Sequence, residues 1–186
     1  MQTQPKEVLK YCPRCGSNRF ICQNKREFIC QICSFHFFIN SSSAVAALIF
    51  DQDGRVMLSR RGVDPNKGML DLPGGFVDPM ESAEEAIYRE IKEELGVEVT
   101  ELQYFISYPN EYVFSEFSVY TTDLAFLCKV DDLKNIKPMD DITCVEFKYP
   151  EEIILSELCS NSMKQIIQEV NKRKKQGVLD LLTKET

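Results

Sequence analysis

The sequence GGFVDPMESAEEAIYREIKEELGV, residues 74–97, contains six glutamates within residues 81–94. Ser82 is a good N-cap for a helix, and Glu85 lies three positions later, which is the spacing of a capping box. Gly96 suits the left-handed residue that ends many helices. The stretch therefore predicts a loop rich in glycine and proline, followed by one helix that begins after Ser82 and ends before Gly96.

Three of the glutamates share one face of this predicted helix. Because each residue advances by about 100°, Glu90, Glu93 and Glu94 fill an arc of about 100°. Carboxylates this close repel one another unless a cation lies among them. Oxygen ligands clustered in this way suit Mg²⁺ or Mn²⁺. The competing interpretation is an acidic face that only contacts solvent, with Arg89 paired to Glu85 or Glu93 four residues away.

The same stretch matches the Nudix box, G-x5-E-x7-R-E-U-x-E-E-x-G-U with U aliphatic. All nine defined positions are filled, by Gly75, Glu81, Arg89, Glu90, Ile91, Glu93, Glu94, Gly96 and Val97. The chain is therefore identified as a member of the Nudix hydrolase superfamily. The resemblance implies an α/β fold, specifically an α/β/α sandwich around a mixed sheet. It also implies Mg²⁺-dependent hydrolysis of a nucleoside diphosphate linked to some group X.

The resemblance also implies roles for individual residues. Glu90 and Glu94 would bind Mg²⁺ or Mn²⁺, and Glu93 would be a further ligand or the base that activates water. The main-chain carbonyl of Gly74 would complete the site, and we expect Asp141 to supply a ligand from beyond the box.

The remaining box residues are expected to support the site. Arg89 would orient the catalytic carboxylates, and Gly75 and Glu81 would hold the loop.

Four cysteines in the first 33 residues form two Cys-x-x-Cys pairs, Cys12 with Cys15 and Cys30 with Cys33. Two such knuckles, brought together by a hairpin, predict a structural zinc site with four sulfur ligands. An iron–sulfur cluster and a redox pair are the alternatives. A segment this short cannot build a core alone, so the metal would supply its folding free energy. The single histidine, His36, is expected to remain outside the site.

The other four cysteines are scattered among apolar residues. We interpret them as buried, inert thiols: Cys22, Cys128, Cys144 and Cys159.

The composition limits the partners. The chain has 186 residues and a formal net charge of −7, which argues against nucleic acid and an anionic membrane as partners. No apolar run is long enough to span a bilayer, and the N-terminus lacks the apolar core of a signal peptide. These features predict a cytoplasmic protein, and the Nudix resemblance implies that its partner is a small nucleotide.

The run NSSS at 40–43 predicts a junction between a zinc ribbon, residues 1–40, and a Nudix domain, residues 41–186, that ends in a helix. In the second domain we expect strands at 44–50, 55–60, 98–106, 119–130 and 143–149. A second helix is expected at 155–175, with a basic end that reads NKRKKQG.

A zinc ribbon before a Nudix domain resembles the NADH pyrophosphatase branch of the superfamily. That branch carries a further N-terminal domain, whereas eleven residues precede Cys12 here. It also carries the signature S-Q-P-W-P-x-P-x-S, where this chain reads SYPNEYVFS at 107–115 and lacks the tryptophan. Four residues are expected to contact the substrate, namely Arg60, Tyr108, Tyr112 and Phe114. For the three aromatic residues, packing in the core or in a dimer interface is an equal alternative.

These patterns together predict a Mg²⁺-dependent pyrophosphatase that acts on a dinucleotide such as NADH, or on ADP-ribose or a nucleotide sugar. The products would be a nucleoside monophosphate and a phosphorylated X. One alternative is a housecleaning hydrolase of modified nucleoside triphosphates. The other is a non-enzymatic sensor or nucleic-acid-binding adaptor. The resemblance is compatible with a homodimer.

Overall fold

The computed structural model describes residues 2–179, and the chain divides into two compact units. The first unit is built from the chain up to Ser42 together with Glu111–Tyr120. The second is built from Ser43–Asn110 and the chain from Thr121 onward. Sequence inspection did not anticipate that Glu111–Tyr120, a segment far along the chain, would join the N-terminal unit.

The first unit contains a three-stranded antiparallel sheet in the order β1-β2-β3 and a short helix. Its elements are α1 (Pro5–Val8), β1 (Phe20–Cys22), β2 (Glu27–Cys30) and β3 (His36–Phe38). The small core consists of two cysteines and two stacked aromatic rings, those of Phe20 and Phe28, whose centroids lie 5.2 Å apart. The segment Glu111–Tyr120 joins this unit through the N–H of Ser118, which donates to the carbonyl of Thr3 at 2.7 Å.

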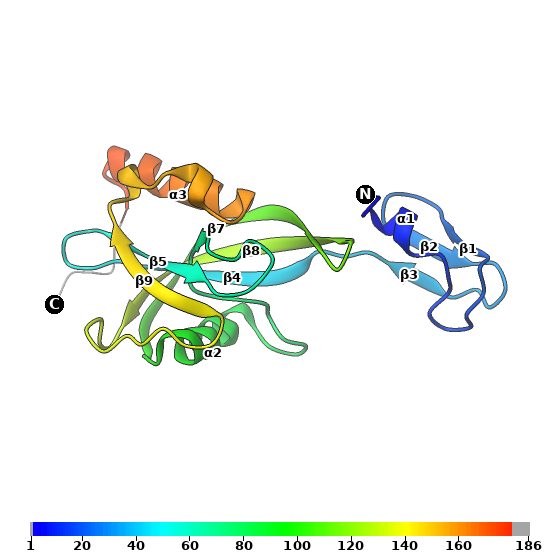
Figure 1. Ribbon diagram of the computed structural model, residues 1–186, viewed down its shortest axis with the longest axis horizontal. Helices are drawn as coiled ribbons and strands as arrows, with labels where there is room; N and C mark the ends of the chain where they lie inside the picture. Colours follow the sequence, from blue (N-terminus) through cyan, green and yellow to red (C-terminus); the bar gives the residue numbers. More distant parts are fainter. Residues whose placement is uncertain (1, 180–186) are drawn as a thin grey trace. The chain divides into compact units, whose positions relative to one another are not determined.

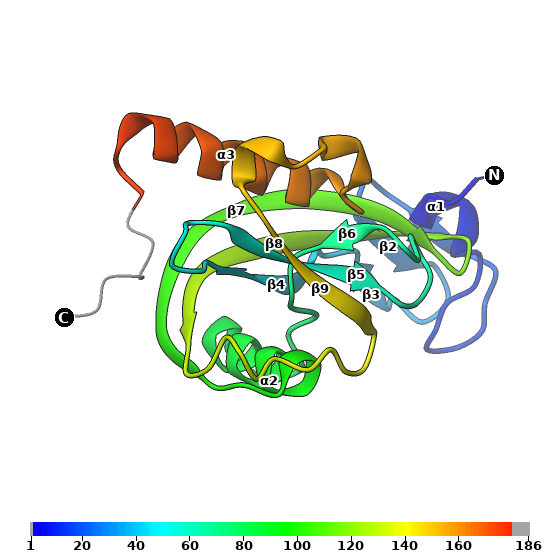
Figure 2. The same cartoon turned by 60° about the vertical axis from the view of Figure 1, so that its left-hand side comes forward.

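The second unit contains two three-stranded sheets, in the orders β4-β8-β7 and β6-β5-β9. The helices α2 and α3 cover opposite sides of these strands (Figures 1 and 2). The bounds are β4 (Ser42–Ile49), β5 (Val56–Arg61), β6 (Leu70–Asp71), α2 (Ala83–Leu95), β7 (Val99–Phe114), β8 (Phe117–Val130), β9 (Ile142–Lys148), the 3₁₀ turns η1 (Pro150–Glu152) and η2 (Leu155–Glu157), and α3 (Asn161–Gln176). The predicted α/β sandwich with a small N-terminal ribbon is confirmed.

The continuous apolar run of β4 is explained by burial on both faces. Val45, Ala47 and Ile49 pack in the core beneath α2, whereas Ala46 and Leu48 pack in the core beneath α3. Successive side chains of a strand point to opposite faces, so a strand between two helical layers must be apolar at every position.

The helix α2 begins and ends as predicted. The hydroxyl oxygen of Ser82 accepts from the N–H of Glu85, the carboxylate of Glu85 accepts from the N–H of Ser82, and Gly96 is left-handed. Four apolar residues of α2 are fully buried, and they fix which face is left for the glutamates: Ala86, Ile87, Ile91 and Leu95.

The predicted start of the second helix at residue 155 is wrong, because α3 begins at Asn161. Leu158 forms a parallel bridge to Leu70, and the N–H of Cys159 donates to the carbonyl of Leu70 at 2.8 Å. The chain must be extended to make these bonds. The hydroxyl oxygen of Ser160 then accepts from the N–H of Met163 at 3.2 Å and caps the helix.

The strand predicted at 98–106 is longer than expected, since β7 continues to Phe114 and β8 follows almost at once. The two strands are joined by Ser115 and Glu116, which have φ values of 49° and 60°. Two consecutive positive φ values are typical of a tight hairpin turn, which usually carries Asn-Gly. Ser-Glu gives no such signal, and the sequence pattern therefore predicted neither a strand nor a turn between residues 106 and 119.

Among residues 2–179, no helix is long and apolar enough to cross a membrane.

Candidate active site and cysteine cluster

The loop before α2 is held against β4 by main-chain hydrogen bonds. The N–H groups of Val45 and Ala47 donate to the carbonyls of Gly75 and Pro73, each at 2.8 Å. Gly74 has a φ of +139°, and a Cβ at that position would lie 2.2 Å from the carbonyl oxygen of Val45. Only glycine fits there, because both the conformation and the contact exclude a side chain.

At the neighbouring Gly75 the close approach is to a side chain of α2. A Cβ on Gly75 would lie 2.4 Å from a carboxylate oxygen of Glu90. The two glycines thus bring the loop backbone into direct contact with the glutamates of α2.

Glu94 is a buried carboxylate, with 8% of the residue exposed. The N–H of Gly74 donates to its Oε2 at 2.9 Å, and none of the described residues forms an ion pair with it. Burial raises the pKa of Glu94 to about 8, and the negative charges of Glu90, Asp71 and Asp140 act in the same direction. This concentration of buried and nearby oxygen ligands fits a divalent cation, which would relieve the repulsion.

Arg89 connects the other acidic residues of the box. Its guanidinium donates to both carboxylate oxygens of Glu81 at 2.8 Å, to Glu90 at 2.7 Å and to Glu93 at 3.2 Å. It also donates to the carbonyl of Phe76 at 3.0 Å. Of the two partners that sequence inspection considered, Arg89 therefore pairs with Glu93.

The hydrogen bonds from Arg89 act to lower the pKa of both Glu81 and Glu90, but they determine the net shift only at Glu81. They lower the pKa of Glu81 to about 2. The pKa of Glu90 is instead raised, because burial outweighs its bond to Arg89. Arg89 therefore holds Glu81 firmly ionised, while Glu90 lies beside the loop at Gly75.

Asp141 has an exposed side chain, and its carbonyl accepts from the N–H of Gly62 at 2.6 Å. The carboxylates from outside α2 that act on Glu94 are Asp71 and Asp140. Sequence inspection missed both of them. A charged residue between the buried Leu70 and Leu72, in LDLPGG, was the available signal for Asp71.

The residues expected to contact substrate are divided between the two units. Arg60 donates to Glu146 of β9 at 2.6 Å and to the carbonyl of Gly68 at 2.7 Å. Tyr108 is half-buried against the core beneath α3. Tyr112 and Phe114 lie in the segment that belongs to the first compact unit, and Phe114 is exposed.

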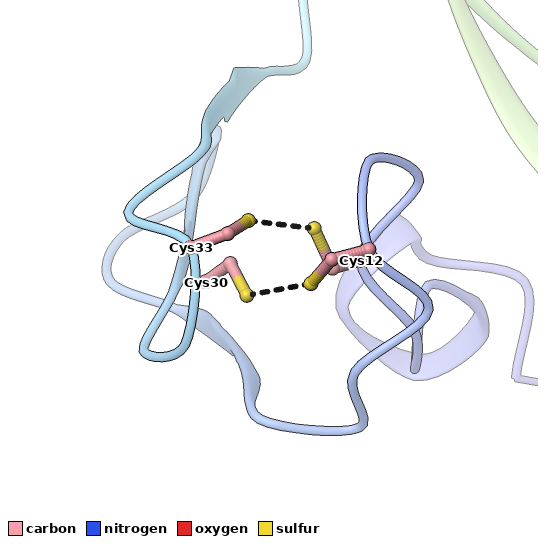
Figure 3. Close-up of side chains that lie close together, drawn as sticks. Cys12, Cys30 and Cys33 are labelled. Carbon is pink, nitrogen blue, oxygen red and sulfur yellow. Dashed lines mark hydrogen bonds between the residues drawn. The ribbon is translucent and has the colours of Figure 1, made fainter.

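In the first unit, Cys12, Cys30 and Cys33 converge on one point (Figure 3). Together with Cys15 they form a group whose sulfur atoms all lie within 4.8 Å of one another. The Sγ atoms of Cys12 and Cys33 are 3.7 Å apart, and those of Cys15 and Cys30 are 3.6 Å apart. These distances are too long for disulfides, whose sulfur atoms lie about 2.05 Å apart. The group can hold a metal ion.

The backbone prepares one of these thiols for coordination. A hydrogen bond from the N–H of Cys33 is the main cause that lowers the pKa of Cys30 to about 6, although burial opposes it. His36 remains outside the group, and its Nδ1 lies 3.1 Å from a carboxylate oxygen of Glu27.

The interpretation of the other cysteines as buried thiols holds for Cys128, whose pKa is raised to about 12 by burial. It is wrong for Cys144, which is exposed on β9. Cys22 and Cys159 are half-buried.

Comparison with curated proteins gives matches that cover only part of each relative. The chain is 38% identical to a CTP pyrophosphohydrolase of Escherichia coli over 36% of its own length and 50% of that protein. It is 41% identical to an ADP-ribose pyrophosphatase of Methanocaldococcus jannaschii over 34% of this chain and 37% of that protein. A longer match, to the NAD-capped RNA hydrolase NudC of Vibrio atlanticus, is 23% identical and covers 86% of this chain and 60% of the relative. The chain thus spans between about two fifths and three fifths of the length of these relatives.

Solved structures share the fold. A NUDIX hydrolase from Nitrosomonas europaea superposes with a TM-score of 0.65 at 20% identity, covering 91% of this chain and 94% of that one. A MutT NUDIX hydrolase from Burkholderia pseudomallei has a TM-score of 0.60 at 21% identity and covers 70% of this chain and 98% of its own. Residues 41–169, more than half of the chain, match the NUDIX domain family. The chain therefore belongs to the NUDIX domain family.

Proposed function

We propose that the chain is a Mg²⁺- or Mn²⁺-dependent pyrophosphatase that hydrolyses a nucleoside diphosphate linked to another group X. The observation that carries the proposal is the buried carboxylate of Glu94, which lies beside other acidic side chains and pairs with no cation among the described residues. Burying a charge is costly unless it is paired or coordinates a metal. Such an arrangement is typical of a binding site rather than of a stabilising surface.

In this proposal Glu90 and Glu94 hold the cation, together with the carbonyl of Gly74. A bound cation would neutralise pyrophosphate charge and lower the pKa of a coordinated water. Glu93, whose side chain is 52% exposed, would accept the proton of that water. Arg89 is a positioning residue, because it holds Glu90 and Glu93 at fixed places on the helix.

We further propose that the cysteine cluster binds one structural Zn²⁺. A tetrahedral zinc with Zn–S bonds of about 2.3 Å requires sulfur atoms about 3.8 Å apart. The Cys12–Cys33 and Cys15–Cys30 separations of 3.7 and 3.6 Å fit this requirement. Four thiolates leave no open position for substrate, so the cluster supports folding and takes no part in hydrolysis.

For the substrate we propose a dinucleotide or ADP-ribose, which would yield a nucleoside monophosphate and a phosphorylated X. Relatives named for ADP-ribose and for NAD-capped RNA support this class. A nucleoside triphosphate is the second candidate, supported by the relative named a CTP pyrophosphohydrolase.

A product assay separates these candidates. Purified protein is incubated with Mg²⁺ and, in turn, NADH, ADP-ribose, diadenosine polyphosphates and nucleoside triphosphates. Release of a nucleoside monophosphate and a phosphorylated partner supports the first class, whereas release of pyrophosphate supports the second. If no phosphoanhydride bond in the panel is cleaved with Mg²⁺ or Mn²⁺, the proposed activity is wrong.

Two matched substitutions on one helix test the site. Glu94→Gln is expected to lower turnover at least about 100-fold, because the neutral amide cannot supply the negative charge that the carboxylate would give to the bound cation. Glu84→Gln is the control, since Glu84 is exposed on the same helix and lies outside the acidic cluster formed by Glu90, Glu93 and Glu94. Full activity of Glu94→Gln, or an equal loss in both variants, would contradict the assignment.

A further inference from the structure

The charge of this protein is divided unequally along the chain. Residues 1–42 contain six lysines and arginines but only two glutamates and no aspartate, which gives +4. Because the whole chain carries −7, the remaining residues carry −11. The hairpin segment in the first unit adds Glu111 and Glu116, and the unit remains positive. The total charge therefore conceals a basic ribbon in an acidic chain.

The sheet of the ribbon has one face in its core and one exposed face. Phe20, Phe28 and Cys30 fill the core. Strand alternation places Ile21, Ile29 and Phe38 on the other face, and Ile21 and Phe38 are 40% and 45% exposed. Ile21 pairs with Ile29 and Ile29 with His36 across the strands, so this exposed face is continuous over β1, β2 and β3.

Three cations border this exposed face. Arg19 immediately precedes β1, and Lys25 and Arg26 form part of the turn that joins β1 to β2. All three side chains are exposed, and none forms an ion pair with any residue in 2–179. Arg19 is fixed in place by hydrogen bonds to the amide oxygen of Gln31 at 3.0 and 3.2 Å.

One acidic residue, Glu27, lies on the same face. Its carboxylate oxygens are engaged by His36 at 3.1 Å and by the side-chain amide of Asn24 at 3.2 Å. The face therefore offers exposed apolar and aromatic surface, bordered by cations that have no acidic partner.

We propose that this face, Ile21, Ile29, His36 and Phe38 with Arg19, Lys25 and Arg26, binds single-stranded nucleic acid. The three cations would contact phosphates, which is the main source of affinity for a polyanion. Phe38 would stack on an unpaired base, a contact available only in a single strand. The surface belongs to the first unit and includes none of the proposed hydrolytic residues, so binding to it requires no hydrolysis.

Binding is measured by fluorescence anisotropy with the full, zinc-loaded chain and a fluorescein-labelled, uncapped RNA of twelve nucleotides. Mg²⁺ and Mn²⁺ are omitted, so that the result does not depend on the proposed activity. The association constant is expected to fall with salt, with a slope of about −0.7 for each phosphate contacted. A labelled duplex of the same length is expected to bind at least about fivefold more weakly than the single strand.

A pair of charge-matched variants locates the binding surface. The triple variant Arg19→Glu, Lys25→Glu, Arg26→Glu is expected to weaken binding at least about tenfold at low salt and to reduce the salt slope by about 2. The control is Lys134→Glu, Lys137→Glu, Lys175→Glu, which reverses three exposed lysines of the second unit and changes the net charge equally. This control is expected to stay within about threefold of the parent protein.

Phe38 is tested separately. Phe38→Ala is expected to weaken binding at least about fivefold, and Phe38→Tyr, which keeps a stacking ring, is expected to restore it. Zinc content of each variant shows that the ribbon is intact. The proposal is overturned if the parent protein does not bind the single strand at low salt, if both triple variants lose the same affinity, or if the duplex binds as tightly as the single strand.

Discussion

The cysteine cluster and the glutamate helix both carry the sequence pattern of a metal site, yet their side chains are arranged differently. The four sulfur atoms lie within 4.8 Å of one another, whereas no other group of three or more acidic, histidine or cysteine ligands in residues 2–179 is gathered this closely. In the acidic cluster, Arg89 pairs with Glu90 and Glu93, and Glu94 bonds instead to the N–H of Gly74.

The difference follows from charge and from backbone geometry. Thiols can be neutral without a metal, so two knuckles can bring four of them together at little electrostatic cost. Ionised carboxylates repel one another. Without a bound cation they must lie farther apart, pair with a cationic side chain or have raised pKa values. A cluster of ligands that is already assembled is thus typical of a structural metal site. An acidic cluster that is incompletely paired is typical of a site that binds and releases its cation together with substrate.

The largest effect is expected from breaking the preassembled cluster. Cys30→Ser should abolish zinc binding and unfold the ribbon, because structural zinc contributes on the order of 10 kcal/mol or more to such a segment. Hydrogen exchange should show loss of protection in the ribbon strands and in Glu111–Tyr120, which bonds to Thr3.

The control is Cys22→Ser, which lies in the ribbon but outside the cluster and should retain zinc. Equal protection in the Cys30→Ser variant and the parent protein would show that the ribbon folds without its metal.

The next largest effect is expected at the loop that supports Glu94. Gly74→Ala should lower the free energy of unfolding by at least about 3 kcal/mol, because the new Cβ would meet the carbonyl of Val45 at 2.2 Å. Urea unfolding measures the loss. Gly68→Ala is the control that separates backbone strain from steric contact, because Gly68 also has a positive φ but has open space around it. This substitution should lower the free energy of unfolding by only about 1 kcal/mol.

A smaller effect is expected from loosening the charge network. Arg89→Lys should lower the turnover of the proposed reaction by roughly tenfold while the protein stays folded, because one ammonium cannot bond Glu81, Glu90 and Glu93 together. Steady-state kinetics on the best substrate of the panel measures this loss. Lys92→Arg, the reverse exchange on an exposed position of α2, should change turnover little, and a comparable loss there would contradict a specific role for Arg89.

The smallest effect concerns Glu81 and depends on pH. Its folded pKa of about 2 lies below its ordinary value of 4.5, so ionisation of Glu81 stabilises the fold above pH 4.5 and this stabilisation is lost as pH falls toward 2. Glu81→Gln should therefore be less stable than the parent protein at pH 7, and the difference should shrink in acid. Urea unfolding at several pH values tests this, with Glu84→Gln as the variant expected to show no such convergence.

Local patterns made much of the fold predictable. The Ser82 and Glu85 capping box and the left-handed Gly96 delimit α2 because a helix end is decided by the few residues that bond there. The start of α3 was not predictable in this way. It depends on the pairing of Leu158 with Leu70, two residues that are far apart in the sequence.

The site shows the same division. Helical spacing alone placed Glu90, Glu93 and Glu94 on one face of α2. Spacing could not show that Asp71 and Asp140 act on Glu94 from other segments. Nor could it show that Glu111–Tyr120 joins the ribbon, since no local signal marks a contact made across the sequence.

The sequence by itself determined the family, the two metal-site patterns and the ends of α2, because each depends on residues close together in the chain. The tertiary structure alone decided which carboxylate is buried, which acids Arg89 holds, and which face of the ribbon is exposed beside its cations. Burial and electrostatic interaction depend on distance in space, and only the folded chain sets those distances.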